Sequence, residues 1–91
     1  MKCLVCYDIS DNRKRRKAAR YLESVAVRIE ESVFLCDLPL SKLALVRQQL
    51  LFITAKDDGR RLLMVPLCMN CAGRMWMEGI PLEKEEHLII A

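Results

Sequence analysis

The sequence predicts a single α+β domain in which two helices cover one face of a small antiparallel sheet. A chain of 91 residues is one domain with a core of modest size. Along it, short apolar runs alternate with two segments of helical periodicity. With 53% hydrophobic and 30% charged residues, the composition is that of a globular protein. So many apolar residues in so small a chain also predict a homodimer, in which a second copy covers part of the surface.

A strand and a helix form the first part of the domain. Lys2–Asp8 is a short apolar run that suits a buried strand. Ser10 or Asp11 can cap a helix that runs to about Ser24, because a short side-chain oxygen accepts from a free amide of the first turn. The apolar stripe of this helix consists of Ala18, Leu22, Val25 and Ala26.

A second β-rich segment and a second helix follow. Residues 27–38 are long for one strand, so they form either two short strands or one strongly bent strand around Glu31-Ser32. The next helix starts at Pro39 and ends near Ile53. Its inward-facing residues are Leu43, Val46, Leu50 and Leu51. Residues 56–59, with the sequence Lys-Asp-Asp-Gly, make a turn.

The last part of the chain is expected to add strands. Arg61–Leu67 is a strand that Pro66 places at a sheet edge or a bulge, because proline cannot donate to the ladder. Residues 75–77 and 87–90 are candidates for short extra strands, and we expect segment 74–91 to take part in dimerisation. The order βαββαβ, with these additions, predicts a ferredoxin-like sandwich that forms one domain over residues 1–91.

Positive charge is concentrated in the first helix. Six of the fifteen basic residues of the chain lie within eight positions, at Arg13, Lys14, Arg15, Arg16, Lys17 and Arg20. The amino end of a helix carries partial positive charge, so each cation there costs roughly 0.3–1 kcal/mol at an exposed position. A bound polyanion would relieve this cost, which points to nucleic acid as the partner. A solvated helix face is the alternative interpretation.

Helical geometry separates these cations into two groups. The face opposite the apolar stripe carries Arg13, Arg16 and Arg20, with Lys17 beside them. We expect this group to hold a nucleic-acid backbone without reading its sequence. Arg15 lies close to the stripe and should point back to the strand end that carries Asp8, where it could steady a phosphate. Alternatively, the stem of Arg15 packs over the sheet and its charge stays in water.

Several stretches together resemble one known family. They are Tyr7–Asp11 with the basic run after it, Arg20–Glu23, Val27–Ile29, Ser32–Phe34, and Val65–Cys68 with Cys71. In order and spacing they resemble the CRISPR-associated protein 2 family, the small subunits of the spacer-acquisition machinery. The resemblance implies a ferredoxin-like homodimer whose last strand is exchanged or shared. It also implies a metal-dependent endonuclease of single-stranded RNA or duplex DNA, or an adaptor that holds duplex DNA between CRISPR-associated integrase dimers.

The resemblance also assigns site residues. Asp8 stands at the position of the metal-binding aspartate, and Tyr7 precedes it as in the family. The basic residues of the family fall on Arg15 and on Arg16 or Lys17, and a further arginine falls on Arg28. We therefore predict Asp8, Tyr7 and Arg15 as catalytic residues. The predicted nucleic-acid-binding residues are Arg13, Lys14, Arg16, Lys17, Arg20 and Arg28.

The chemistry of Asp8 favours a site that two chains share. Hydrolysis of a phosphodiester with Mg²⁺, or another divalent cation, needs the ion to activate water and neutralise charge on the phosphate. Mg²⁺ often takes only one or two carboxylates together with waters and substrate phosphates. One Asp8 would be a poor site, whereas two copies across a dimer axis would make a plausible one. Alternatively, Asp8 only turns the strand into the helix.

The cysteines suggest a different kind of functional site, one that would bind metal or carry out redox chemistry. Cys3 with Cys6, and Cys68 with Cys71, form two CxxC units that could bind zinc. Residues three apart in a strand point to opposite faces, which argues against Cys3 and Cys6 as joint ligands. Cys68 and Cys71 could form a redox pair or half of a two-chain metal site, or could be ordinary loop residues. A small metal- or redox-handling protein is therefore a third function class, while Cys36 is assigned to the core.

Cysteine usage and hydropathy bear on the compartment. Five cysteines without an export signal predict a reducing cytoplasm. The longest apolar run, Leu62–Met69, is far shorter than the roughly 20 residues of a membrane span, so we expect no membrane partner.

Overall fold

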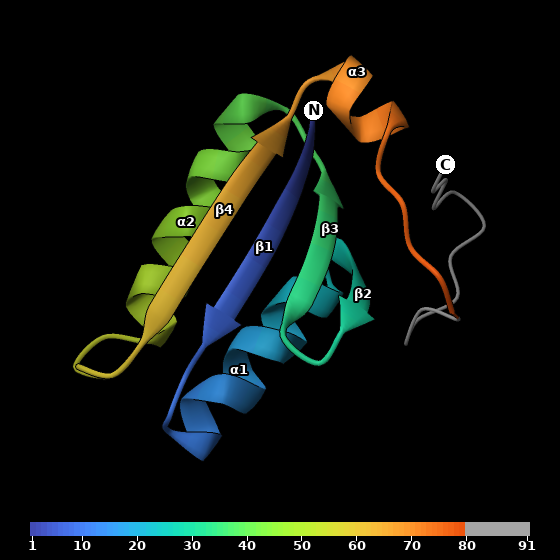
Figure 1. Cartoon of the computed structure of the whole chain (residues 1–91). Coiled ribbons are helices and arrows are strands. Elements are labelled where there is room, and N and C mark those ends of the chain that lie inside the picture. Colours follow the sequence, from blue (N-terminus) through green and yellow to red (C-terminus); the bar gives the residue numbers. More distant parts are fainter. Residues whose placement is uncertain (80–91) are drawn as a thin grey trace.

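The computed structural model describes residues 1–79 and confirms the α+β architecture. One sheet has the strand order β2-β3-β1-β4, and all neighbouring strands are antiparallel (Figure 1). The elements in chain order are β1 (Lys2–Asp8), α1 (Asn12–Glu23), β2 (Ala26–Glu30), β3 (Val33–Asp37), α2 (Leu40–Ile53), β4 (Arg61–Leu67) and α3 (Met69–Gly73). The first six of these are the βαββαβ unit expected from the sequence.

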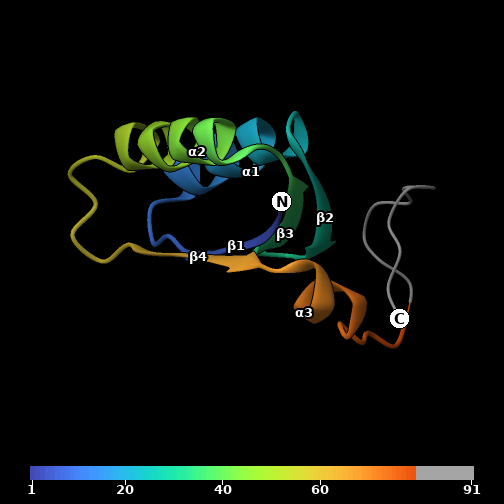
Figure 2. The same ribbon diagram turned by 90° about the horizontal axis from the view of Figure 1, so that it is seen from above.

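Helices α1 and α2 lie side by side over one face of the sheet, as Figure 2 shows from above. Strand β1 alternates between this face and the other. Its buried residues Cys3, Val5 and Tyr7 face the helices and pack in one core with residues of α1, β3 and α2. Cys36 is fully buried in that core, as predicted.

Several local predictions are confirmed. Segment 27–38 forms two strands joined by a tight turn at Glu31-Ser32. Strand β4 is an edge strand, which explains how Pro66 is tolerated within it. Asp11 caps α1 by accepting a 2.8 Å hydrogen bond from the backbone amide of Lys14.

Other predictions are wrong. Residues 75–77 form no strand in the described chain; the short helix α3 precedes them instead. Leu51 is 45% exposed because it lies about 100° around α2 from Leu50, which occupies the core. Of the predicted stripe of the first helix, Ala18 and Leu22 are buried as expected. Val25 and Ala26 also pack against the core but lie beyond the end of α1 at Glu23. The predicted strand at 87–90 lies outside the described residues.

The sheet face that α1 and α2 leave uncovered is apolar. Alternation places Leu4 and Cys6 of β1 on this face, together with Leu63 and Val65 of β4. Leu63 is 57% exposed and Val65 36% exposed. Helix α3 lies on this side of the sheet (Figure 2). We call these four residues the helix-free face, because neither α1 nor α2 covers them, and they form a surface suited to contact with another protein.

Candidate nucleic-acid and metal site

Asp8 ends β1 and carries an exposed carboxylate. It is still in register with the sheet, opposite Arg61 of β4. Because Tyr7 points to the helices, Asp8 points to the same side as Cys6, at the margin of the helix-free face. Within residues 1–79, no three side chains of His, Cys, Asp or Glu gather to form a metal site. Asp8 therefore does not belong to a ready-made cluster of three or more ligands within residues 1–79.

The loop after Asp8 is held by a residue that the sequence analysis did not single out. Asp57, 7% exposed, comes from the loop between α2 and β4. Its carboxylate accepts hydrogen bonds from the Ser10 hydroxyl at 2.9 Å, the Gly59 amide at 3.2 Å and the Asp11 amide at 3.5 Å. Desolvation works to raise the pKa of Asp57, but these hydrogen bonds outweigh it and lower the pKa. Asp57 thus fixes the segment between Asp8 and α1.

Two cations of the basic run are bound by carbonyl groups close to this loop. Arg15 Nη1 donates a 2.9 Å hydrogen bond to the Ile9 carbonyl, and Arg15 Nη2 donates to Asn12 Oδ1. Lys14 Nζ donates a 2.6 Å hydrogen bond to the Ala55 carbonyl. Arg15 thus turns back to the strand end, as expected, but its hydrogen bonds go to Ile9 and Asn12 rather than to the carboxylate of Asp8. These contacts offset part of the repulsion within the basic run.

The remaining cations of α1 are displayed to solvent. Arg13, Arg16, Lys17 and Arg20 are all exposed. The first turn of α1 contains no acidic residue that could neutralise them. The ion pairs found in the described part of the chain join other residues. We call these four residues the basic face of α1; its charge is available to a polyanion.

A groove of about 440 Å³ separates α1 from the turn between β2 and β3. Its lining residues are Tyr7, Arg15, Arg16, Ala19, Arg20, Glu23, Arg28, Glu31 and Ser32. Four arginines and two glutamates thus line one concave surface. The groove brings predicted catalytic and predicted binding residues together, but without Asp8.

Tyr7 forms the floor of this groove. It is 6% exposed and stacks on Phe34 with ring centroids 6.1 Å apart. Its hydroxyl donates a 3.3 Å hydrogen bond to the Glu31 carbonyl. Burial raises the pKa of Tyr7, although the nearby charge of Arg28 opposes this. Because Tyr7 and Asp8 point to opposite faces of β1, one chain does not bring their functional groups together.

Arg28 is held firmly beside Tyr7. Its Nη1 lies 3.1 Å from Glu23 Oε1, and its Nε and Nη2 donate to the Glu31 carbonyl at 3.2 and 2.7 Å. The guanidinium also lies 5.4 Å from the ring centroid of Phe34. These contacts fix the orientation of Arg28 at the wall of the groove, where the carboxylates of Glu23 and Glu31 pair with its charge.

Comparison with known proteins identifies the family. The family described as CRISPR associated protein Cas2 matches residues 1–75. The protein named CRISPR-associated endoribonuclease Cas2 1 from Chloroflexus aurantiacus is 36% identical over 89 residues, which cover 96% of each chain.

Solved structures share the fold of this chain. A crystal structure of the hypothetical protein TT1823 from Thermus thermophilus has a TM-score of 0.76 at 27% identity, covering 92% of this chain and 96% of its own. Streptococcus pyogenes Cas2 shares the fold, with a TM-score of 0.73 at 20% identity, covering 87% of this chain and all of its own. No helix within residues 1–79 is long and apolar enough to cross a membrane. The chain therefore belongs to the CRISPR-associated protein Cas2 family, as its sequence resemblance implied.

Proposed function

We propose that this protein is a homodimeric, metal-dependent endonuclease of CRISPR spacer acquisition that cuts phosphodiester bonds in RNA or duplex DNA. The observation that carries the proposal is the position of Asp8, an exposed carboxylate at the margin of an apolar sheet face. A relative 36% identical over nearly the whole chain is named an endoribonuclease, which supports the choice of chemistry.

Dimerisation through the helix-free face would complete the site. Packing two copies face to face removes the half-exposed Leu63 and Val65 from water, which is favourable by about 25 cal/mol per Å² of apolar surface. The same packing brings the two Asp8 residues toward one dimer axis. Segment 74–91 could extend the contact.

The paired Asp8 carboxylates would hold Mg²⁺ or another divalent cation. Hard oxygen donors suit this ion, and its remaining positions are commonly filled by waters and substrate phosphates. When bound, such an ion supplies an activated water and neutralises charge on the phosphate. The two carboxylates would face one another only in the dimer, so metal binding and dimerisation are coupled.

The arginines would position the substrate. The basic face of α1 binds the phosphate backbone independently of sequence. Arg15, anchored on the Ile9 carbonyl beside Asp8, keeps a positive charge near the strand end. Arg28 and the hydroxyl of Tyr7 line the adjoining groove.

A second candidate function is that of an adaptor without catalysis. The basic face of α1 favours it, because duplex DNA binding needs these cations and does not need Asp8. In that role the dimer would bridge CRISPR-associated integrase subunits. A protein dedicated to metal or redox chemistry at its CxxC units is not favoured, given the family to which the chain belongs.

Cleavage assays separate the two functions. The wild-type dimer is incubated with single-stranded RNA and with duplex DNA, in Mg²⁺ and then in excess chelator. Cleavage in Mg²⁺ that stops in chelator is the expected result. If the protein binds duplex DNA tightly but cleaves neither nucleic acid in any divalent metal, the nuclease function is ruled out and only the adaptor function is supported.

A further inference from the structure

Cys68 and Cys71 lie together on the surface at α3, far along the chain from the residues of the proposed nuclease site. Both are exposed free thiols. The backbone amide of Cys71 donates a 3.3 Å hydrogen bond to the sulfur of Cys68. Cys3 and Cys36, in contrast, are fully buried, and burial raises the pKa of Cys36 to about 11. Buried thiols of this kind are inert, so any thiol reactivity should concentrate at Cys68 and Cys71.

The two exposed thiols differ in acidity because of their mutual contact. Hydrogen bonds from the amide and then the thiol of Cys71 lower the pKa of Cys68. Donating that thiol hydrogen bond, and facing the charge of Cys68, raises the pKa of Cys71. A more acidic thiol next to a less acidic one is the arrangement that thiol–disulfide exchange uses.

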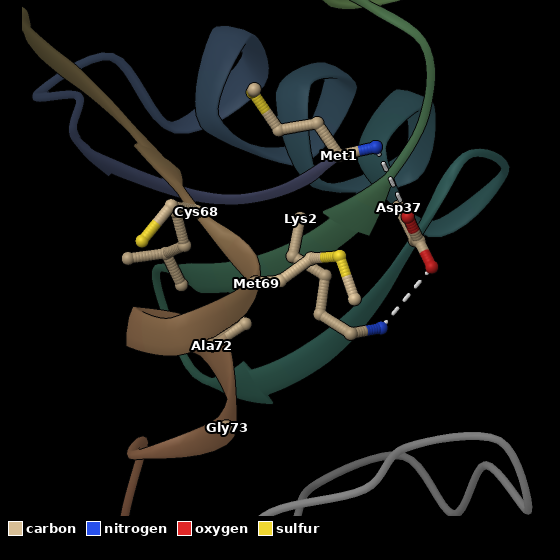
Figure 3. A pocket seen from close by; sticks show the side chains of 8 residues that line it. Met1, Lys2, Asp37, Cys68, Met69, Ala72 and Gly73 are labelled. Carbon is tan, nitrogen blue, oxygen red and sulfur yellow. Dashed lines mark hydrogen bonds and ion pairs between the residues drawn. The ribbon is translucent and has the colours of Figure 1, made fainter.

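A cavity lies beside one of the two thiols, Cys68. This cavity of about 430 Å³ between the start of β1 and α3 includes Cys68 and Met69 in its lining. Figure 3 shows the side chain of Cys68 directed away from Asp37. Asp37 forms ion pairs with the two positively charged groups on its side of the cavity. Asp37 pairs with the terminal ammonium of Met1 at 3.4 Å and with Lys2 Nζ at 3.1 Å. Cavities of this size accommodate small molecules.

A metal site at the pair is not supported by its surroundings. Zinc in structural sites takes four ligands. Within residues 1–79, no group of three or more His, Cys, Asp or Glu side chains could hold an ion. Two thiols alone suit disulfide formation better, because the side chains of Cys68 and Cys71 are close enough to share a hydrogen bond.

We propose that Cys68 and Cys71 are a redox-active dithiol that exchanges with small-molecule disulfides such as glutathione disulfide. The Cys68 thiolate attacks one sulfur of the disulfide, forms a mixed disulfide and releases one thiolate. Cys71 then loses its proton, attacks the sulfur of Cys68 and releases the second thiolate. The protein dithiol gives up two electrons and two protons, and the small disulfide becomes two thiols. The resulting Cys68–Cys71 bond closes the first turn of α3, at the point where the chain passes from β4 into this helix.

Thiol mapping tests this assignment on the full chain. The reduced protein is treated with glutathione disulfide, remaining thiols are alkylated, and peptides are identified by mass spectrometry. We expect a Cys68–Cys71 disulfide within one chain that dithiothreitol reverses. Cys71→Ser should accumulate glutathione on Cys68, whereas Cys68→Ser should react about tenfold more slowly because the more acidic thiol is gone. Serine is a good helix cap, so Cys68→Ser should fold.

Cys6→Ala is the matched control, because it removes a half-buried thiol, keeps the helix-free face apolar and should leave the exchange unchanged. The proposal is overturned if glutathione disulfide leaves both thiols free in the folded protein, or if it links Cys68 only to a second chain. The pair would instead be a metal site if added Zn²⁺ protects both thiols from alkylation and glutathione disulfide forms no disulfide between them. That result would also overturn the proposal. None of these outcomes depends on nuclease activity.

Discussion

The carboxylate of Asp57 accepts a 2.9 Å hydrogen bond from the hydroxyl of Ser10, a residue 47 positions earlier in the chain. This contact ties the loop between α2 and β4 to the loop that follows Asp8. The second carboxylate oxygen accepts from the Asp11 amide, immediately before α1. One buried side chain thus fixes the position of the end of β1, where Asp8 lies, relative to the helix that carries the basic face.

Asp57→Asn should destabilise the fold. Asparagine keeps one oxygen acceptor but turns an amide group toward the donors that the carboxylate bound, so at least one buried donor loses its partner. The urea midpoint of unfolding, followed by circular dichroism, should fall clearly. Asp58→Asn is the control, since Asp58 is exposed and should leave the midpoint unchanged. Equal midpoints for both variants would show that Asp57 does not anchor the loop.

Stability should also depend on pH through Asp57. Its pKa is lower in the folded protein than the value of about 3.9 typical of an unfolded chain. The stabilisation is therefore complete above about pH 4 and is lost as the pH falls through the folded pKa. The stability difference between wild type and Asp57→Asn, measured by urea unfolding, should shrink as the pH is lowered from 6 toward 3. A difference that grows in acid would contradict the assigned direction of the pKa shift.

Removing the basic face of α1 should weaken nucleic-acid binding. The triple variant Arg13→Ala/Arg16→Ala/Arg20→Ala loses exposed cations that pair with no carboxylate in residues 1–79. Duplex DNA affinity should fall, and the log–log salt slope should flatten by about 0.9 for each phosphate that the variant no longer neutralises. Filter binding over a range of salt concentrations measures both quantities.

The control for that experiment removes the same charge elsewhere. Lys42→Ala/Arg47→Ala/Arg74→Ala takes three exposed cations from α2 and from the end of α3. It should change the salt slope much less than the α1 variant. Equal losses from the two variants would mean that overall net charge, rather than the basic face, governs binding.

Leu63→Glu should disrupt self-association. Leu63 is 57% exposed on the helix-free face, and a charge there would be buried without a partner in the proposed dimer. Sedimentation equilibrium should show dimerisation weakened by about tenfold or more. Leu45→Glu is the matched control, since Leu45 of α2 is 50% exposed on the opposite layer. Undiminished dimerisation of Leu63→Glu would place the interface on another surface.

The strands and helices were predictable because their signals are local. The apolar run Lys2–Asp8 predicted the buried strand β1, and Asp11 is a good helix cap by residue type. Helix α3 was missed because its five residues, Met-Asn-Cys-Ala-Gly, are too few to show a helical period.

The anchoring residues were not predictable because their contacts are long-range. Asp57 lies in the sequence Lys-Asp-Asp-Gly, which indicates a solvent-exposed turn, and nothing near it reveals Ser10 as a partner. The contacts of Arg28 with Glu23 and Glu31 likewise depend on how the β2–β3 turn meets α1. Sequence periodicity sorted the cations of α1 by face, but could not show that Lys14 and Arg15 are held by loop carbonyls.

Asp8→Asn is the most direct test of the proposed nuclease site. Wild type, Asp8→Asn and the exposed-aspartate control Asp58→Asn are compared side by side on RNA and duplex DNA, in Mg²⁺ and in chelator, with duplex binding measured on the same samples. We expect Asp8→Asn to lose cleavage while keeping dimerisation and DNA binding, and Asp58→Asn to behave as wild type. Metal-dependent cleavage by Asp8→Asn at the wild-type rate would contradict the assignment of Asp8 as the metal-binding carboxylate.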